Sequence, residues 1–302
     1  MGGMTAPKNF KDLAQLWFRE ALRGLSRHTL VHHEYTLRLG GMRYLANASL
    51  QEISTGMADE ILAEIERERG PSARNHTRNQ LNQIWRWLER RGLYSGPNPW
   101  RGARPVATMR RRTPLMGEQA RRVDQICWAA FSGAGDANIS PVWAAYFLLL
   151  LRTALRASEG THLRWDECNP RRRTITISRH KTARRRGAKV IPMVDDAFRL
   201  LEEVRGRGWC SYWVFPSPRA NGTHVKDPYH PWNRVRTLAQ CPAVRIHDIR
   251  HGFAQSMHDA GADIKQVRDM LGHSSVKTTE EYLGASEIGG LRAAATRAIG
   301  WS

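Results

Sequence analysis

The sequence has 302 residues, enough for about two domains of ordinary size. Hydrophobic residues make up 41% of the chain, which argues against global disorder because a proper core can form. The formal net charge of +19 predicts a polyanionic partner, with a nucleic acid as the first candidate and a basic protein without such a partner as the plain alternative.

The first hundred residues have the spacing of amphipathic helices. Apolar residues from Phe10 to Leu22 recur at three- and four-residue steps, which predicts a helix with one buried stripe. Gly70-Pro71 is a stop signal for a later helix, because both residues break helical structure. Further helices are expected at about 29–45, 57–65 and 79–90. Together they predict a compact all-α domain over residues 1–97.

A basic segment over residues 98–114 forms the predicted domain boundary. It holds prolines, a glycine and five arginines but no acidic residue. Proline and glycine break regular structure, and unbalanced positive charge stays solvated or meets phosphate. The segment is therefore either a plain flexible linker or a linker that lies along a nucleic acid. The second interpretation gives DNA contacts to Arg110, Arg111 and Arg112.

From residue 115 the pattern becomes mixed and predicts an α+β domain over residues 115–285. Residues 174–178 alternate like a half-buried strand, and residues 190–193 are its expected partner. The most apolar run, Val142 to Leu151, has about half the length of a membrane span, so we expect a buried core helix and no membrane association. Helices are expected at about 118–131, 141–153, 229–239, 248–260, 263–271 and 276–283.

The four cysteines contain no C-x-x-C pair, so they predict neither a zinc ribbon nor a thioredoxin motif. Without a secretory signal they are expected to be reduced thiols of a cytoplasmic protein.

Three short motifs in the second half carry residues suited to phosphodiester chemistry. Arg156 lies within Thr153–Glu159, Arg250 ends His247-Asp248-Ile249-Arg250, and Leu271-Gly272-His273 is followed nine residues later by Tyr282. Planar guanidinium groups match phosphate oxygens with paired donors, so two arginines can grip both non-bridging oxygens. A tyrosine becomes a usable nucleophile when arginines and a proton acceptor lie beside it.

The order and spacing of these motifs closely resemble the tyrosine recombinase, or phage integrase, family over nearly the whole chain. Ile249 departs mildly from the leucine usual at that place. The resemblance implies a mainly α fold with a small β-sheet, in which an N-terminal all-α, SAM-like core-binding domain precedes the catalytic domain. It implies a site-specific DNA recombinase that forms a 3′-phosphotyrosine with neither metal nor cofactor. The implied catalytic residues are Arg156, Lys181, His247, Arg250, His273 and Tyr282.

The resemblance also implies individual roles. The family carries its catalytic lysine on the turn of a β-hairpin, which points to Lys181 as the general acid; a lysine that only contacts the DNA backbone is the alternative. Lys189 is a less favoured substitute, because it leads into the second strand. The same hairpin is rich in Lys and Arg, and its expected DNA contacts are Arg184, Arg185 and Arg186.

Two further residues are expected to support the site without touching the substrate. Glu159 lies one helical turn after Arg156, where a carboxylate can orient the guanidinium; a solvent-facing charge is the alternative. His251 follows His247 by four residues, as in the zinc-protease pattern H-E-x-x-H, but Asp248 replaces the glutamate and no third ligand motif follows. We therefore expect no metal site and a supporting role for His251.

The expected partners are double-stranded DNA with core or attachment sites and three further copies of the chain, in a homotetramer on two duplexes. An accessory directionality factor remains open. The expected location is the cytoplasm, in association with a bacterial nucleoid, and the expected role is integration or excision of a prophage or mobile element. The rival functions are strand relaxation by a type IB topoisomerase and a catalytically silent DNA-binding regulator. Residues 286–302 are expected to form a C-terminal tail that docks on its own domain or is exchanged between subunits.

Overall fold

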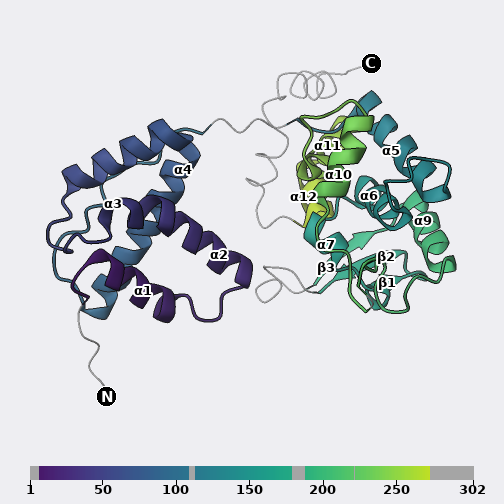
Figure 1. Ribbon diagram of the computed structural model, residues 1–302. Helices are drawn as coiled ribbons and strands as arrows, with labels where there is room; N and C mark the ends of the chain where they lie inside the picture. Colours follow the sequence, from purple (N-terminus) through teal and green to yellow (C-terminus); the bar gives the residue numbers. More distant parts are fainter. Residues whose placement is uncertain (1–6, 109–112, 179–187, 221, 273–302) are drawn as a thin grey trace, which may run out of the picture. The chain divides into compact units, whose positions relative to one another are not determined.

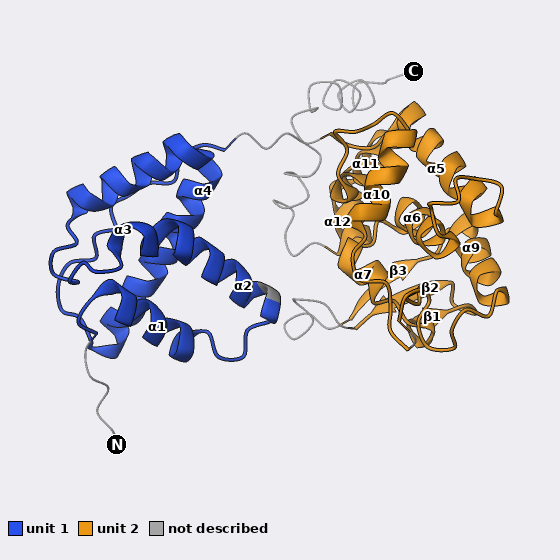
Figure 2. Ribbon diagram, in the orientation of Figure 1, with its two compact units in different colours: residues 1–110 blue, residues 111–302 orange. Residues whose placement is uncertain are grey.

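The computed structural model describes residues 7–108, 113–178, 188–220 and 222–272. It divides into two compact units, residues 1–110 and residues 111–302 (Figures 1 and 2). Within the described residues, no helix combines the length and the apolar character needed to cross a membrane.

Unit 1 is helical throughout its regular structure. Helix α1 (Phe10–Ala21) begins after Asn9, whose side chain accepts a hydrogen bond from the backbone N–H of Asp12 at 2.9 Å. The long segment α4 (Thr55–Arg91) is two helices joined at Gly70, whose φ of 82° breaks the helical path just before Pro71. Its elements are α1 (Phe10–Ala21), α2 (Arg27–Thr36), the π-helical turn η1 (Leu37–Met42), α3 (Arg43–Leu45) and α4 (Thr55–Arg91).

The first part of the predicted linker packs on unit 1. Trp100 is fully buried in the core of this unit, and its ring meets that of Trp85. The side chain of Asn75 on α4 donates to the carbonyl of Val106 at 2.8 Å and accepts from the N–H of the same residue at 2.9 Å. Arg78 donates to the carbonyl of Ala103 at 2.7 Å. The chain is thus fastened to α4 as far as residue 106.

In unit 2, further helices and a small sheet surround the strongly apolar helix α6 (Pro141–Thr153). The elements of this unit are α5 (Gly117–Ser132), α6 (Pro141–Thr153), α7 (Ala157–Thr161), the 3-10 turn η2 (Trp165–Glu167), β1 (Cys168–Asn169), β2 (Thr174–Ile177), β3 (Lys189–Pro192), α9 (Asp195–Gly206), α10 (Tyr229–Leu238), α11 (Ile246–Asp259) and α12 (Ile264–Leu271). Helix α6 packs against α5, α9 and α11, and its residues from Ala144 to Leu150 are all buried. The run that is too short for a membrane span is therefore the centre of the core, as predicted.

The sheet is antiparallel, with strand order β1-β2-β3. In the pairing of β2 with β3, Ile177 lies opposite Lys189 and Ile175 lies opposite Ile191. All four side chains are buried, so Lys189 occupies a core-facing position of the strand. The prediction of a mainly helical fold with a small β-sheet is confirmed. Helix α9 and the short elements α7 and β1 were not predicted.

The chain enters unit 2 along helix α11. The N–H of Leu115 donates to the carbonyl of Asp248 at 3.2 Å, and the Leu115 side chain is buried. The backbone of Leu115 lies so close to Gly252 that a Cβ there would overlap the Leu115 carbonyl. Glycine at position 252 allows this close approach.

Candidate active site

The turn between α6 and α7 places Arg156. Thr153 is fully buried, and its hydroxyl donates to the carbonyl of Leu149 at 2.7 Å. Ala154 then adopts a left-handed conformation with φ 51°, which is uncommon for a residue with a Cβ, and ends α6. The chain reverses there, so Arg156 becomes the residue that precedes the first turn of α7.

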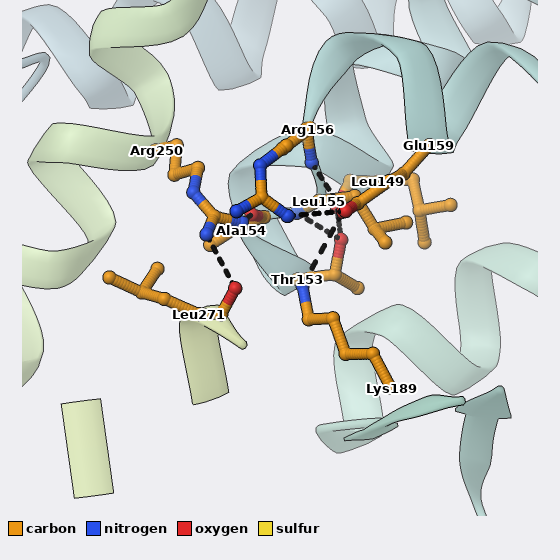
Figure 3. A network of polar contacts seen from close by, with 9 residues as sticks. All are labelled: Leu149, Thr153, Ala154, Leu155, Arg156, Glu159, Lys189, Arg250 and Leu271. Atoms are coloured by element: carbon orange, nitrogen blue, oxygen red, sulfur yellow. Dashed lines mark hydrogen bonds and ion pairs between the residues drawn. The ribbon is translucent and has the colours of Figure 1, made fainter. Parts of the chain in front are cut away.

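The carboxylate of Glu159 binds both the backbone and the side chain of Arg156. It accepts one hydrogen bond from the backbone N–H of Arg156 at 2.9 Å and another from Nη1 of the same residue at 2.6 Å (Figure 3). The Glu159 side chain is only 3% exposed, whereas that of Arg156 is 38% exposed. The buried carboxylate therefore holds one side of the guanidinium, while the rest of the group stays open to solvent and can bind an anion.

Arg250 reaches the same place from helix α11. Its residue is 1% exposed, and its Nη1 donates to the carbonyl of Ala154 at 2.6 Å. Its Nη2 donates to the carbonyl of Leu271, the last residue of α12 (Figure 3). One guanidinium thus joins the α6–α7 turn, which carries Arg156, to the end of α12.

Lys189 also belongs to this cluster, although the sequence reasoning preferred Lys181. It rises from the start of β3, and its Nζ lies 3.4 Å from Oε2 of Glu159 (Figure 3). Its side chain is 6% exposed. The signal that could have found it is the strand alternation, which puts residue 189 in phase with the apolar residue Ile191.

His247 and His251 lie one turn apart on α11. The rings of His247 and His251 meet edge to face with centroids 5.0 Å apart. His251 is buried, whereas His247 is exposed. Among the described residues, no group of three or more His, Cys, Asp or Glu is placed to hold a metal ion.

The N-terminal end of α11 is fixed by a second carboxylate. Asp248 is fully buried and accepts from the backbone N–H of Arg245 at 2.9 Å and from the guanidinium of Arg245 at 3.0 Å. Glu159 binds the backbone and side chain of Arg156 in the same way. Each of the two helices that present a predicted catalytic residue therefore begins with a buried acid that holds its first turn.

The charged groups of the cluster shift one another's pKa values. Burial alone would raise the pKa of Glu159, but the ion pairs with Lys189 and Arg156 outweigh it and lower that pKa to about 2. Burial, assisted by the positive charge of Arg250, lowers the pKa of Lys189 to about 8 although Glu159 opposes the change. Desolvation of the ring and the positive charge of Arg250 lower the pKa of His247. Arg156 and Lys189 share the carboxylate of Glu159, and Arg250 adds a third positive charge nearby, so the cluster has an excess of positive charge, which favours binding of an anion.

The remaining predicted residues lie outside the described part of the chain. These are Lys181, His273, Tyr282, the linker residues Arg110, Arg111 and Arg112, and the hairpin residues Arg184, Arg185 and Arg186. Gly272, with φ 63°, ends α12 directly before His273 in the sequence.

Comparison with known proteins gives the family. The sequence profile of the phage integrase family matches residues 125–287, more than half of the chain. Tyrosine recombinase XerC of Brucella melitensis is 25% identical over 284 residues, which cover 88% of this chain and 86% of that protein. Tyrosine recombinase XerD of Rhizobium meliloti is 27% identical over 288 residues, which cover 89% of this chain and 88% of that protein.

Solved structures show the same fold at lower identity. The Tn1549 transposon integrase in complex with a circular intermediate DNA matches with a TM-score of 0.78 and 16% identity, covering 96% of this chain and 99% of that chain. A lambda integrase tetramer bound to a Holliday junction matches with a TM-score of 0.71 and 15% identity, covering 92% and 79%. The family profile, the relatives and the fold agree: the chain belongs to the phage integrase family and is a tyrosine recombinase.

Proposed function

We propose that this recombinase cleaves and rejoins double-stranded DNA at specific sites, with Tyr282 as the nucleophile. The observation that carries the proposal is the hydrogen bond from Arg250 to the carbonyl of Ala154, in the turn that presents Arg156. It holds two arginines in one cluster that has an excess of positive charge. Guanidinium groups from two separate helices suit the two non-bridging oxygens of one phosphodiester. The family profile extends through residue 287 and so includes Tyr282.

The reaction needs two transfers of one phosphoryl group. The phenolic oxygen of Tyr282 attacks phosphorus, the bond from phosphorus to the 5′-oxygen breaks, and Lys181 gives a proton to that leaving oxygen. A 5′-hydroxyl from a second duplex then attacks the 3′-phosphotyrosine and releases the tyrosine. Arg156, Arg250 and His273 stabilise the charge on the phosphorane, and His247 contacts the phosphate and moves a proton.

The bond energy stays in the enzyme–DNA ester, so the reaction needs no nucleotide. We further propose that residues 1–97 bind core DNA beside the catalytic domain of residues 115–285, that the segment between them lies along the duplex, and that four copies act on two duplexes. Attachment sites of a prophage or mobile element are the proposed targets, with an accessory factor to set direction. The solved relatives bound to a circular intermediate and to a Holliday junction support this assembly.

A suicide substrate tests the nucleophile. A nicked duplex from the flanks of the gene loses a short fragment on cleavage, so the covalent complex accumulates and can be seen on a denaturing gel. Wild-type protein should form the 3′ adduct, also in the presence of EDTA, and Tyr282→Phe should bind the duplex without forming it. The matched control is Tyr229→Phe, because Tyr229 is 67% exposed on α10, outside the arginine cluster. An adduct with Tyr282→Phe contradicts the assignment.

Two-site substrates separate the rival functions. A recombinase joins two sites carried on different DNA molecules. A type IB topoisomerase would relax supercoiled plasmid without joining sites, and a silent regulator would bind without either reaction.

A further inference from the structure

Lys189 is a buried charged residue with no part in the reaction sequence above. Lysine is rarely buried without a partner, because taking an ammonium group out of water is costly. Its side chain is 6% exposed and lies at a core-facing position of β3. A core-facing position would otherwise suit an apolar residue such as Ile191.

The ammonium group of Lys189 touches the residue that orients Arg156. Nζ lies 3.4 Å from Oε2 of Glu159, and this same oxygen accepts the backbone N–H of Arg156. The other carboxylate oxygen accepts Nη1 of Arg156. Lys189 and Arg156 therefore share one carboxylate, and the lysine limits how that carboxylate can turn (Figure 3).

The stem of Lys189 touches the end of α12. A Cβ on Gly272 would lie 2.5 Å from Cδ and 2.7 Å from Cε of the lysine, so the stem packs directly on the glycine backbone. The preceding residue, Leu271, accepts a hydrogen bond from Arg250. The Lys189 side chain thus contacts Glu159, which binds Arg156, and also Gly272, which follows the Leu271 carbonyl bound by Arg250.

We propose that Lys189 is a positioning residue for strand cleavage. By contacting Glu159 and the backbone of Gly272, it keeps the Arg156 guanidinium and the end of α12 in the positions that bind the phosphate. This inference rests on the proposed function. Lys181 on the hairpin keeps its role as general acid, and Lys189 acts through Glu159 rather than on the DNA.

The charge of Lys189 is part of this role. The charged groups that face it are Glu159 on α7, Arg156 directly before α7 and Arg250 on α11. Burial lowers the pKa of Lys189 to about 8, so the ammonium form prevails at pH 7 and is lost as the pH rises through that value. Above about pH 8 the carboxylate loses this partner, and the cleavage rate falls with it.

The first test compares cleavage with binding. Lys189→Met keeps the length of the stem and removes the charge. Its single-turnover cleavage of the suicide substrate at saturating DNA should be at least about tenfold slower than wild type, with the Kd for the duplex unchanged. Lys226→Met is the matched control, because Lys226 is exposed and should cleave as wild type does.

A double mutant tests the route through Glu159. If Lys189 acts through this carboxylate, Lys189→Met should slow the Glu159→Gln protein little further, since residues in one network are not additive. An equal loss in both backgrounds contradicts the inference, as does wild-type cleavage by Lys189→Met.

A charge-preserving variant covers the case in which Lys189→Met does not fold. Lys189→Arg carries a guanidinium that does not titrate near pH 8, so the alkaline fall of its cleavage rate should move to higher pH than in wild type. An alkaline fall at the wild-type pH overturns the inference. If wild-type protein forms no adduct at all, the proposed function has failed instead, so the two failures can be told apart.

Discussion

Nη1 of Arg250 lies 2.6 Å from the carbonyl oxygen of Ala154, and this hydrogen bond joins two residues that are 96 positions apart. Ala154 precedes Arg156 by two residues, so one predicted catalytic arginine fixes the turn that presents the other. Arg250 is almost fully buried, whereas the Arg156 side chain is 38% exposed. Arg250 therefore combines a role in the fold with its proposed role at the phosphate.

Replacement of Arg250 by lysine should damage both roles. Lysine keeps the charge but lacks the planar fork that reaches the carbonyls of Ala154 and Leu271 together. A buried carbonyl without its donor costs about 1–3 kcal/mol, which urea unfolding would measure as a lower free energy of unfolding. Cleavage of the suicide substrate should be lost as well. Arg234→Lys is the control, because that residue forms a half-exposed ion pair with Asp136 and should change stability by less than about 1 kcal/mol.

Replacement of Arg156 by alanine should affect catalysis much more than binding. Among the described residues, the side chain of Arg156 is bonded to Glu159, and the proposed DNA contacts are spread over the chain. We expect cleavage to fall by about 100- to 1000-fold, the usual effect of removing one group that stabilises developing charge. A filter-binding isotherm should give a nearly unchanged Kd; a large rise in Kd would mean that Arg156 mainly grips DNA.

Neutralising Arg110, Arg111 and Arg112 together should have the opposite effect. If these residues contact phosphates, the triple alanine variant binds more weakly, and the slope of log K against log salt becomes shallower by up to about 0.9 for each lost contact. Binding isotherms at several salt concentrations measure this slope. If the triple variant binds DNA with wild-type affinity at moderate salt, the segment is a flexible linker without DNA contacts.

Glu159 should make the protein sensitive to acid. Its pKa is lowered to about 2 in the folded state, so its contribution to stability is present above about pH 4.5 and is lost as the pH falls from there to about 2. The side chain is buried, and the full shift corresponds to about 3 kcal/mol. The difference in free energy of unfolding between wild type and Glu159→Gln should therefore shrink over this range. Glu118→Gln is the control for loss of a carboxylate at an exposed position.

Deletion of residues 286–302 should leave single-site binding nearly intact. If the tail is exchanged between subunits, synapsis and recombination of two sites should both fall, because neighbouring active sites lose a contact. Gel-shift assays with one and two sites would separate these steps. Recombination at the wild-type rate would exclude a role of the tail in assembly.

Much of the fold of unit 2 could be predicted because its signals are local. The apolar run after Pro141 gave the bounds of α6, and the alternation in residues 174–177 gave β2. Helix α9 was missed although Ala197, Leu200, Leu201 and Val204 have helical spacing and acidic residues fill its first turn. The pattern that predicts this helix is therefore present in the sequence.

The interior of the site could be predicted only in part. The pairing of Arg156 with Glu159 follows from their spacing within one turn. The contacts of Arg250 do not follow from spacing, because they use backbone carbonyls that only packing brings near. Lys189 is the intermediate case, since its position in the strand was visible but its contact with Glu159 depends on how the sheet meets α7.

The contact between Leu115 and Gly252 sets a limit on where unit 2 can be cut. A fragment that starts at Gly117 would remove a buried leucine and leave the Asp248 carbonyl without the N–H of residue 115. Both losses fall on α11, the helix that carries His247 and Arg250. A separately produced unit 2, or a fusion of unit 2 to another DNA-binding module, should therefore begin before Leu115. Leu115, at the end of the segment between the two units, thus packs on α11 and protects it from solvent.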